Sequence, residues 1–418
     1  MYRQRHPERS VFYRVLFHYF ESFLLEYESR FEREYGYFRP IIQEVVDRYL
    51  DCGNPMCGFA RIQCPNCGEE HLLMFSCKTR GFCLSCHAKR REEWGEWMRR
   101  ELLLDVPHRQ VVFTVPKMLR LFFRYKRALL SPLSLAAVHA LLKYFRAVTD
   151  HELMPGVVAV IQTFGDRINF HPHIHILATE GGTAPGGAFR HVSRFHDERI
   201  RKIFTHEVFS LLLREKLIGL SLVEKIITWR HTGFNVHSQV RAQTKREAER
   251  VGKYMIRPLL SLKRLFFDET KGKVRYQYSR QGSQEERMDY LEFIARVTSH
   301  IPDKGQVMVR YYGLYSNAHR GKIRKAGVSP FHPLIIEGQY HVPSRGWAEM
   351  IRKVYEIDPL ICPSCRGQMR IIAFIEDPKA IDKIIRHLKL SFQAERPPPS
   401  QLIQQELLIA AEEHGEYF

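Results

Sequence analysis

The sequence predicts an α+β protein, because helical and strand patterns both occur in it, in separate segments. Apolar residues recur at helical spacing through residues 41–50, with polar residues on the opposite face. Short apolar runs bounded by turn residues predict strands at residues 110–115, 157–164 and 173–178. A cysteine-rich segment, residues 52–87, separates the first helices from these strands. A chain of 418 residues is long enough for two or three domains with a sizeable core.

The other elements follow from the same patterns in chain order. Further helices are expected at residues 1–50, 89–104, 118–144, 198–217 and 239–256. Pro258 stops the last of these helices, because proline has no backbone N–H to donate. Weaker patterns predict strands at residues 226–230 and 307–314 and helices at residues 347–357 and 380–390.

The chain is strongly basic, with 64 lysine and arginine residues against 46 aspartate and glutamate residues and a formal charge of +18. Such an excess indicates a polyanionic partner, because neutralised phosphates release their counterions. A basic surface that only maintains solubility is the alternative. The apolar stretch 11–25 is interrupted by His18 and Glu21 and is too short and too polar to span a bilayer. We therefore expect an intracellular protein without a membrane segment.

Seven of the nine cysteines lie between residues 52 and 86, a density typical of metal binding in an intracellular protein. Two Cys-x-x-Cys pairs, Cys64/Cys67 and Cys83/Cys86, are expected to close one tetrahedral structural zinc site. The other candidate ligands nearby are Cys52, Cys57, Cys77, His71 and His87. They allow either a second zinc site or the replacement of one of the four thiolates by Cys77.

A further Cys-x-x-Cys pair and a basic run are weaker signals. Cys362 and Cys365 form an isolated pair, which needs additional ligands such as His387 to bind zinc. The run Lys89-Arg90-Arg91 follows the cysteine-rich segment and is suited to contacting a phosphate backbone. A solvated helix face has the same composition.

The segment His173-Ile174-His175 is a candidate metal site. If it is a strand, both imidazoles point to the same face, about 7 Å apart along the backbone. Two imidazoles at this spacing can chelate one divalent ion and leave coordination positions open for substrate oxygens. The alternative is a structural pair of histidines. His171 can join the same face, although Pro172 interrupts the alternation.

Tyr254 lies near the end of a predicted helix, between Lys253 and Arg257. A phenol with its usual pKa of about 10 is a poor nucleophile at neutral pH. Neighbouring cations favour the phenolate and stabilise negative charge on a phosphate. A half-buried amphipathic side chain is the alternative, and since the chain has 19 tyrosines, physical chemistry alone does not select this one.

These segments together resemble the HUH rolling-circle transposases of insertion-sequence family ninety-one, of the single-tyrosine type with an N-terminal zinc-binding domain. The specific combination is the histidine strand NFHPHIHILATEGG with the tyrosine segment KYMIRPLLSLKRL. The resemblance covers most of the chain, in residues 52–90, 113–116, 169–182, 233–241, 253–265, 309–316 and 347–365.

The resemblance implies a mechanism and assigns roles to residues. His173 and His175 would hold a catalytic Mg²⁺ or Mn²⁺, beside structural Zn²⁺ at Cys52, Cys64, Cys67, Cys77, Cys83 and Cys86. Tyr254, assisted by Arg257, would attack a single DNA strand and form a 5′-phosphotyrosine link, which is later transferred to a target strand. DNA contacts are expected from Lys89, Arg90, Arg91, Lys253 and Arg264.

The resemblance also implies an architecture and partners. The core would be an antiparallel sheet flanked by helices, preceded by a helical segment and a zinc-binding module. The expected divisions are a helical segment (1–51), a zinc-binding domain with a basic helix (52–104), a catalytic domain (105–270), its extension (271–345) and a C-terminal region with a Cys-x-x-Cys pair (346–418). Expected partners are single-stranded DNA at element ends and target DNA, with homo-oligomers possible, in the bacterial cytoplasm at the nucleoid.

One departure from the family pattern and one gap remain. Some members carry two tyrosines four residues apart, but Arg250 and Pro258 occupy those positions around Tyr254. The third ligand of the catalytic metal is open, with Gln162, Glu180, Gln239 and Gln243 as candidates.

Two other functions compete with this interpretation. A rolling-circle replication initiator or relaxase would use the same chemistry, although the zinc module and the lack of a GxxxxGK[ST] motif disfavour a large initiator. A non-catalytic, zinc-dependent nucleic-acid-binding protein would use the histidines and Tyr254 only structurally. An RNase-H-like transposase is disfavoured, because no clustered carboxylate triad stands out.

Overall fold

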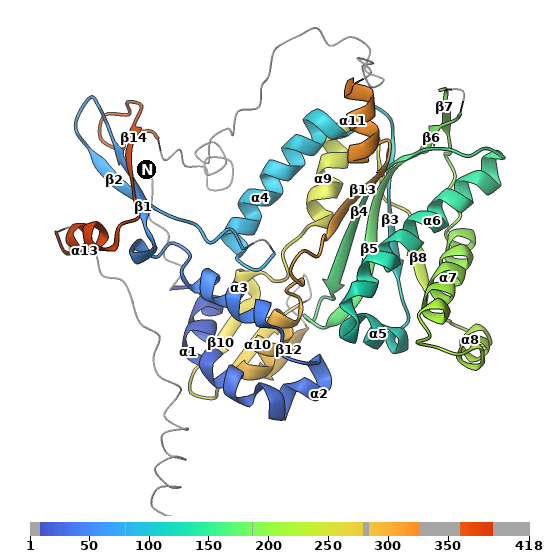
Figure 1. Ribbon diagram of the computed structural model, residues 1–418, viewed down its shortest axis with the longest axis horizontal. Helices are drawn as coiled ribbons and strands as arrows, with labels where there is room; N and C mark the ends of the chain where they lie inside the picture. Colours follow the sequence, from blue (N-terminus) through green and yellow to red (C-terminus); the bar gives the residue numbers. More distant parts are fainter. Residues whose placement is uncertain (1–8, 80, 186, 279–283, 326–359, 388–418) are drawn as a thin grey trace, which may run out of the picture.

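The computed structural model describes residues 9–79, 81–185, 187–278, 284–325 and 360–387 (Figure 1). The helix predicted at residues 347–357 lies outside these ranges. Helices and antiparallel sheets are both present, which confirms the α+β class.

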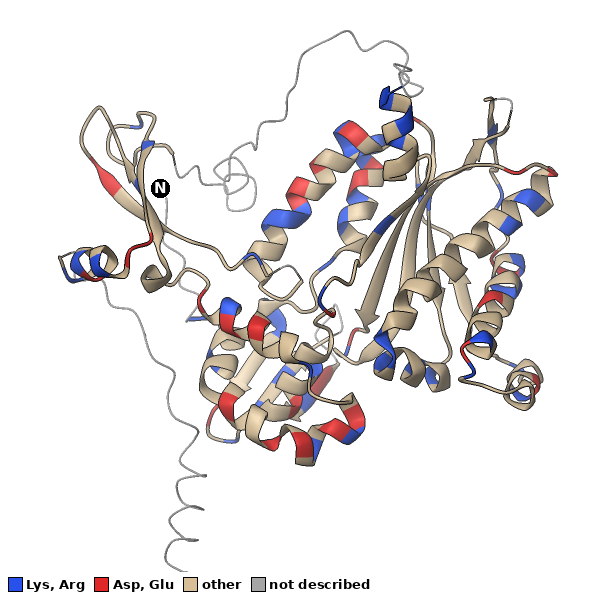
Figure 2. Ribbon diagram, in the orientation of Figure 1, with Lys and Arg blue, Asp and Glu red and all other residues tan. Residues whose placement is uncertain are grey.

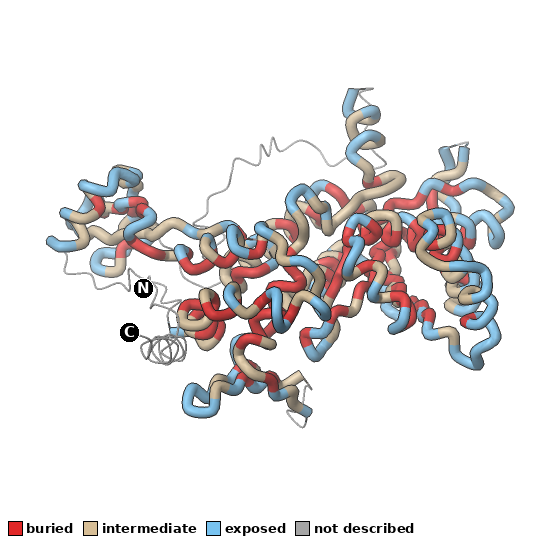
Figure 3. Tube along the Cα trace, turned by 60° about the horizontal axis from the view of Figure 1, so that its bottom comes forward, coloured by how far each residue is buried: buried red, intermediate tan, exposed pale blue. Residues whose placement is uncertain are grey.

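A six-stranded sheet forms the centre of the molecule, and every strand pair in it is antiparallel. The order is β13-β4-β5-β3-β8, with β9 also paired to β3. These strands are β3 (His108–Thr114), β4 (Gly156–Phe164), β5 (Phe170–Thr179), β8 (Asn235–His237), β9 (Arg241–Ala242) and β13 (Val309–Gly313). The three strands predicted from short apolar runs are β3, β4 and β5, and they are neighbours. Buried residues follow these strands (Figure 3).

One face of the sheet packs on helices α5 (Arg120–Tyr125), α6 (Leu130–Thr149) and α7 (Asp197–Arg214) (Figure 1). The segment 118–144, predicted as one helix, contains two helices, α5 and α6, and a short 3-10 turn precedes each of them. Residues 127–149 are long and apolar enough to cross a membrane, but 61% of the relevant window is buried inside the protein. Such burial is typical of a core helix.

The strand predicted at residues 226–230 is wrong. Helix α8 (Leu220–Ile227) occupies its first residues, and no strand follows within that range. Leu222, Val223 and Ile226 have the i, i+3, i+4 spacing of a helix face, and Ile226 is buried in the core on the α7 side. The short apolar run was thus the last turn of an amphipathic helix.

The other face of the sheet packs on α4 (Leu84–Trp97), the π-turn Met98–Leu102 and α9 (Lys245–Met255), which lie side by side (Figure 1). Trp94 on α4 and Met98 in the π-turn meet Val160 and Leu177 from the sheet in one buried cluster. Helix α9 begins later than the predicted residue 239, because the Thr244 hydroxyl accepts a hydrogen bond from the Glu247 amide and caps the helix there.

A second core joins segments far apart in the chain. Its N-terminal part is α1 (Val11–Glu26), α2 (Glu32–Tyr35) and α3 (Pro40–Leu50). The other part is β10 (Leu265–Asp268), β11 (Lys273–Gln277), β12 (Glu285–Asp289) and α10 (Tyr290–Ser299). Phe12 on α1 stacks edge-on against Phe293 on α10, with ring centroids 6.1 Å apart. The predicted segments 1–51 and 271–345 therefore share a hydrophobic core.

A small three-stranded sheet, here called the ribbon, is built from both ends of the chain. Strand β1 (Phe59–Gln63) pairs with β2 (Glu70–Met74) on one side and with β14 (Arg370–Ile375) on the other. Helix α13 (Pro378–His387) follows β14 and corresponds to the helix predicted at residues 380–390. Among the described residues, the other strands are β6 (Gly181–Thr183) and β7 (Phe189–His191), and the other α-helix is α11 (Asn317–Lys325).

Candidate functional site

His173 and His175 lie on β5, a strand in the interior of the central sheet. Both side chains face the α4 and α9 side of the sheet, whereas Ile174 between them is buried in the opposite core. The two imidazoles are 7% and 5% exposed, and their ring centroids are 4.9 Å apart. The predicted placement of two convergent histidines on one strand face is present in the structure.

Hydrogen bonds and burial influence the protonation of these imidazoles. The Nδ1–H of His173 donates to the carbonyl of His171 at 2.7 Å, so its lone pair is on Nε2. The side-chain Nε2 of Gln110 lies 3.0 Å from Nδ1 of His175. Burial lowers the pKa of His173 to about 4 and that of His175 to about 3. Both are therefore neutral at neutral pH, the form that ligates metals.

Gln162 on β4 completes the arrangement from the neighbouring strand. It lies directly opposite His173 in the register, so the two side chains share a face, and it is 3% exposed. Its Nε2 donates to the carbonyl of Met255 on α9. Its Oε1 is buried and has no hydrogen-bond partner among the described residues. A buried amide oxygen without a partner is costly, and a cation held by the two histidines would satisfy it.

The other candidates for the third ligand are held in ion pairs or are exposed. Both carboxylate oxygens of Glu180 are held in ion pairs, by Arg109 at 2.6 Å and by Arg241 at 2.7 Å. Gln239 and Gln243 are exposed. His171 is also on β5, but the three histidines are not among the groups of ligand atoms that converge within 4.8 Å in the described residues.

Tyr254 lies in the last turn of α9, above the histidines. Its ring is 6.3 Å from that of His175, centroid to centroid, at an interplanar angle of 89°. The side chain is 49% exposed, so the hydroxyl can meet a substrate from solvent. The guanidinium carbon of Arg257 is 5.7 Å from the Tyr254 ring, and this side chain also pairs with Asp166 at 3.3 Å. The predicted nucleophile, cation and histidines therefore lie together.

Lys253 does not point toward this group. Its ammonium forms ion pairs with Glu92 on α4 at 2.6 Å and with Glu249 at 2.7 Å. It therefore links α9 to α4. Arg90 and Arg91 lie on α4 beside acidic neighbours, and their side chains are 45% and 36% exposed. Basic and acidic residues are interspersed along this helix (Figure 2).

The cysteines form two clusters, each with four sulfur atoms within 4.8 Å of one another. We name them by position: the core cluster is Cys52, Cys77, Cys83 and Cys86, and the ribbon cluster is Cys64, Cys67, Cys362 and Cys365. Four convergent thiols match the tetrahedral Cys₄ coordination of structural zinc.

The prediction that the two N-terminal Cys-x-x-Cys pairs close one site is wrong. Pairing of β14 with β1 brings Cys362 and Cys365 onto Cys64 and Cys67, with Sγ–Sγ distances of 3.4 Å. The second pair instead meets cysteines at the end of α3 and before α4. His71, His387 and Cys57 belong to neither cluster.

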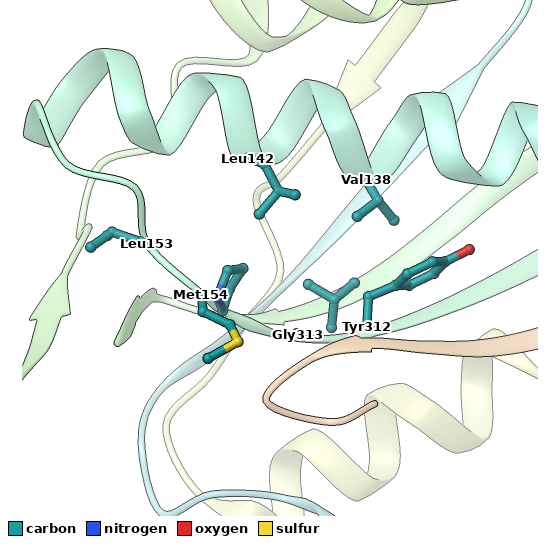
Figure 4. Close-up of a pocket in the computed structure, with 8 residues that line it drawn as sticks. Val138, Leu142, Leu153, Met154, Tyr312 and Gly313 are labelled. Carbon is teal, nitrogen blue, oxygen red and sulfur yellow. The ribbon is translucent and has the colours of Figure 1, made fainter. Parts of the chain in front are cut away.

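An apolar cavity lies elsewhere. It has a volume of about 140 Å³ and is lined by Val138, Leu142, Leu153, Met154, Pro155, Val157, Tyr312 and Gly313 (Figure 4). Val157 and Tyr312 belong to the core on the α6 side of the sheet, opposite the histidines. The cavity is therefore separate from the candidate metal site.

Comparison with known proteins identifies the family. Residues 20–115 match the family model of the IS91 transposase zinc-binding domain, and residues 156–322 match a model described as "Putative transposase". The chain belongs to the IS91 family of transposases. This confirms the family suggested by the histidine and tyrosine segments. The IS91 zinc-binding match includes the core cluster and half of the ribbon cluster, and the second match includes Gln162, both histidines and Tyr254.

Two relatives of this IS91-family chain are similar along much of their length. The transposase for insertion sequence element IS801 of Pseudomonas savastanoi pv. phaseolicola is 28% identical over 361 residues, which are 82% of this chain and 86% of the relative. The "Putative transposase y4qJ" of Sinorhizobium fredii is 28% identical over 291 residues, 62% and 70% of the two chains. No solved structure matches.

Sequence reasoning missed two polar contacts around the site. Gln110 lies at an inward-facing position of β3, and a glutamine among apolar residues in a buried strand signals a polar partner. His87 was noted only as a possible zinc ligand, but its ring contacts the end of α9. No local pattern could have indicated that contact.

Proposed function

We propose that this IS91-family transposase cuts and joins single-stranded DNA with Tyr254 as the nucleophile, in a rolling-circle mechanism. The observation that carries the proposal is the position of Tyr254. Its half-exposed ring lies 6.3 Å from that of His175, on the face of the sheet that also bears His173 and Gln162. A nucleophile beside a candidate cation site is an arrangement suited to phosphodiester cleavage.

The residues of the chain then have distinct tasks. The Tyr254 hydroxyl loses its proton to solvent and attacks the scissile phosphorus. The bond from phosphorus to the 3′-oxygen breaks, that oxygen takes up a proton, and a 5′-phosphotyrosine link remains. Arg257 is placed to stabilise negative charge on the phosphate. Attack of a 3′-hydroxyl on this link joins the strands, and no ATP is needed because the link retains the energy of the broken bond.

His173, His175 and Gln162 would hold the catalytic Mg²⁺ or Mn²⁺. Such an ion polarises a phosphodiester oxygen and leaves positions open for substrate. The fit rests on two buried imidazoles and one buried amide oxygen that lacks a partner among the described residues. The amide carbonyl oxygen of Gln162 is a ligand type that suits Mg²⁺ and Mn²⁺.

Replacement of Gln162 with alanine is expected to weaken Mn²⁺ binding by at least roughly 10- to 100-fold, because loss of a residue that only orients a metal ligand already has an effect of this size. Gln162→Glu keeps an oxygen at the position and should retain the affinity. Isothermal titration calorimetry of the zinc-loaded protein measures both. Gln43→Ala, an exposed glutamine on α3, is the control. Equal affinity in Gln162→Ala and the control would remove Gln162 from the metal site.

The two cysteine clusters are proposed to bind one structural Zn²⁺ each. Native mass spectrometry should therefore find two zinc ions per chain. The double variant Cys362→Ser/Cys365→Ser should retain one, since only the ribbon cluster loses ligands. Cys57→Ser should retain both, because Cys57 lies in neither cluster. A double variant that still binds two ions would contradict the ribbon site.

The proposed partners are single-stranded DNA at element ends and target DNA, bound at the bacterial nucleoid. Basic residues on α4 and Arg264 near the tyrosine segment are the proposed backbone contacts. The ion pairs of Lys253 with Glu92 and Glu249 argue against a direct DNA contact for that residue.

The test of this function is a covalent-adduct experiment. The protein is mixed with Mn²⁺ and labelled single-stranded oligonucleotides that cover the element ends, then separated under denaturing conditions. Proteolysis and mass spectrometry of the shifted band should place the nucleotide on the peptide that carries Tyr254. Binding of the strand without any adduct would favour a non-catalytic DNA-binding protein.

A further inference from the structure

The C-terminal end of α9 is held from two sides. Carbonyls in the last turn of a helix lack partners within the helix and need others. The carbonyl of Met255 accepts from Gln162 in the candidate metal site. The carbonyl of Ile256, the C-terminal cap, lies 2.6 Å from Nε2 of His87. Tyr254 immediately precedes both carbonyls.

The imidazole of His87 is fixed as a donor to this carbonyl. The backbone N–H of Gly81 donates to its Nδ1 at 3.2 Å, so the ring proton is on Nε2 and points to Ile256. Gly81 adopts φ +83°, a left-handed conformation that a side chain would disfavour. The loop before α4 therefore sets the orientation of the ring.

The core cluster surrounds both ends of this contact. Gly81 lies in the loop between Cys77 and Cys83, and His87 follows Cys86 directly. The backbone N–H of His87 donates to the carbonyl of Cys83 at 2.8 Å. A metal ion bound by these thiolates would therefore fix the loop, the first turn of α4 and the His87 ring as one unit.

Further contacts bind α9 to α4 along their length. A Cβ atom at Gly252 would collide with the Met98 side chain and come within 3.1 Å of the Trp94 ring. Lys253, the next residue on α9, forms an ion pair with Glu92 on α4. The two helices therefore pack closely against each other.

We propose that the core cluster positions the nucleophile, with His87 as the positioning residue that links the metal-bound start of α4 to the end of the Tyr254 helix. This inference rests on the proposed role of Tyr254. It gives the zinc-binding module a part in cleavage in addition to a part in folding or DNA contact.

The test compares His87→Ala and His87→Gln in the full zinc-loaded chain. Alanine removes the donor, whereas the glutamine amide can replace Nε2–H. In His87→Ala we expect hydrogen exchange of the amides at residues 254–257 to rise by up to about tenfold, as for the loss of one hydrogen bond. We expect adduct formation at saturating oligonucleotide to slow by roughly 10- to 100-fold, because small displacements of a reacting group have effects of this size.

Zinc content and oligonucleotide affinity should not change in His87→Ala. His87→Gln should restore most of the protection from hydrogen exchange and most of the rate of adduct formation. His206→Ala, an exposed histidine on α7 across the sheet, is the control. Unchanged exchange and rate in His87→Ala would overturn the proposal, and so would loss of zinc, since His87 would then act on the metal site itself. Hydrogen exchange needs no DNA, so it tests the link even if the wild-type protein forms no adduct and the proposed function fails.

Discussion

Tyr254→Phe is expected to abolish formation of the covalent adduct, with a loss of at least about 10⁴-fold in rate, since removal of a nucleophile has effects of this order or larger. The substitution deletes one oxygen atom and keeps the ring that packs edge-on against His175. Fold, zinc content and affinity for single-stranded DNA should therefore be unchanged. Single-turnover assays on denaturing gels measure the rate, and fluorescence anisotropy measures the binding.

Tyr37→Phe is the matched control, because Tyr37 is 85% exposed and lies on the N-terminal helical segment. This variant should react like the wild-type protein. An adduct that persists in Tyr254→Phe would assign the nucleophile to another residue. A parallel loss of DNA binding would instead indicate that the hydroxyl holds the substrate.

The double variant His173→Ala/His175→Ala is expected to lose Mn²⁺ binding and at least about 10³-fold in adduct formation, because polarisation of a phosphoryl oxygen by a metal ion is worth several kcal/mol. Burial keeps both imidazoles neutral, so no neighbouring group depends on a charge on either ring. Binding of single-stranded DNA without metal should therefore persist. Calorimetry with Mn²⁺ and the same gel assay give the two readouts.

His300→Gln provides the opposite pattern. His300 is 8% exposed, and its two nitrogens lie near the Thr163 hydroxyl at 3.1 Å and the Ile168 carbonyl at 3.0 Å. It is a structural histidine, so its replacement should lower the melting temperature and leave Mn²⁺ binding intact. If the double variant lost stability in the same way and still reacted with Mn²⁺, the histidine pair would be structural too.

Local sequence patterns predicted the strands at the centre of the sheet, because the alternation that defines a strand lies within a few consecutive residues. The alternation in His173-Ile174-His175 places one face toward the candidate metal site and the other in the core, and period-two placement needs no knowledge of the rest of the chain. The choice of Gln162 as the proposed third ligand depends instead on the register between β4 and β5. Gln162 faces His173 because of the register in which β4 and β5 pair. That register shifts after Gln162, at the end of β4.

Assignments that depend on distant contacts could not be predicted. Cys64 and Cys67 meet Cys362 and Cys365 because β14 pairs with β1, and strand pairing over such a separation has no signature in spacing. The contact between His87 and Ile256 has the same origin. The strand prediction at residues 226–230 was wrong for a different reason, because a short apolar segment fits a strand and the end of a helix equally well.

The two cysteine clusters also differ in when they can form during synthesis. All four ligands of the core cluster have been translated once residue 86 is in place. Cys67 and Cys362 are 295 residues apart, which at about 5–20 residues per second is roughly 15 to 60 s of translation. During that interval the first thiols of the ribbon have no partners from the end of the chain. The ribbon is therefore among the last parts of the nascent protein to be completed, after the strands that carry the histidines and the helix that carries the tyrosine have left the ribosome.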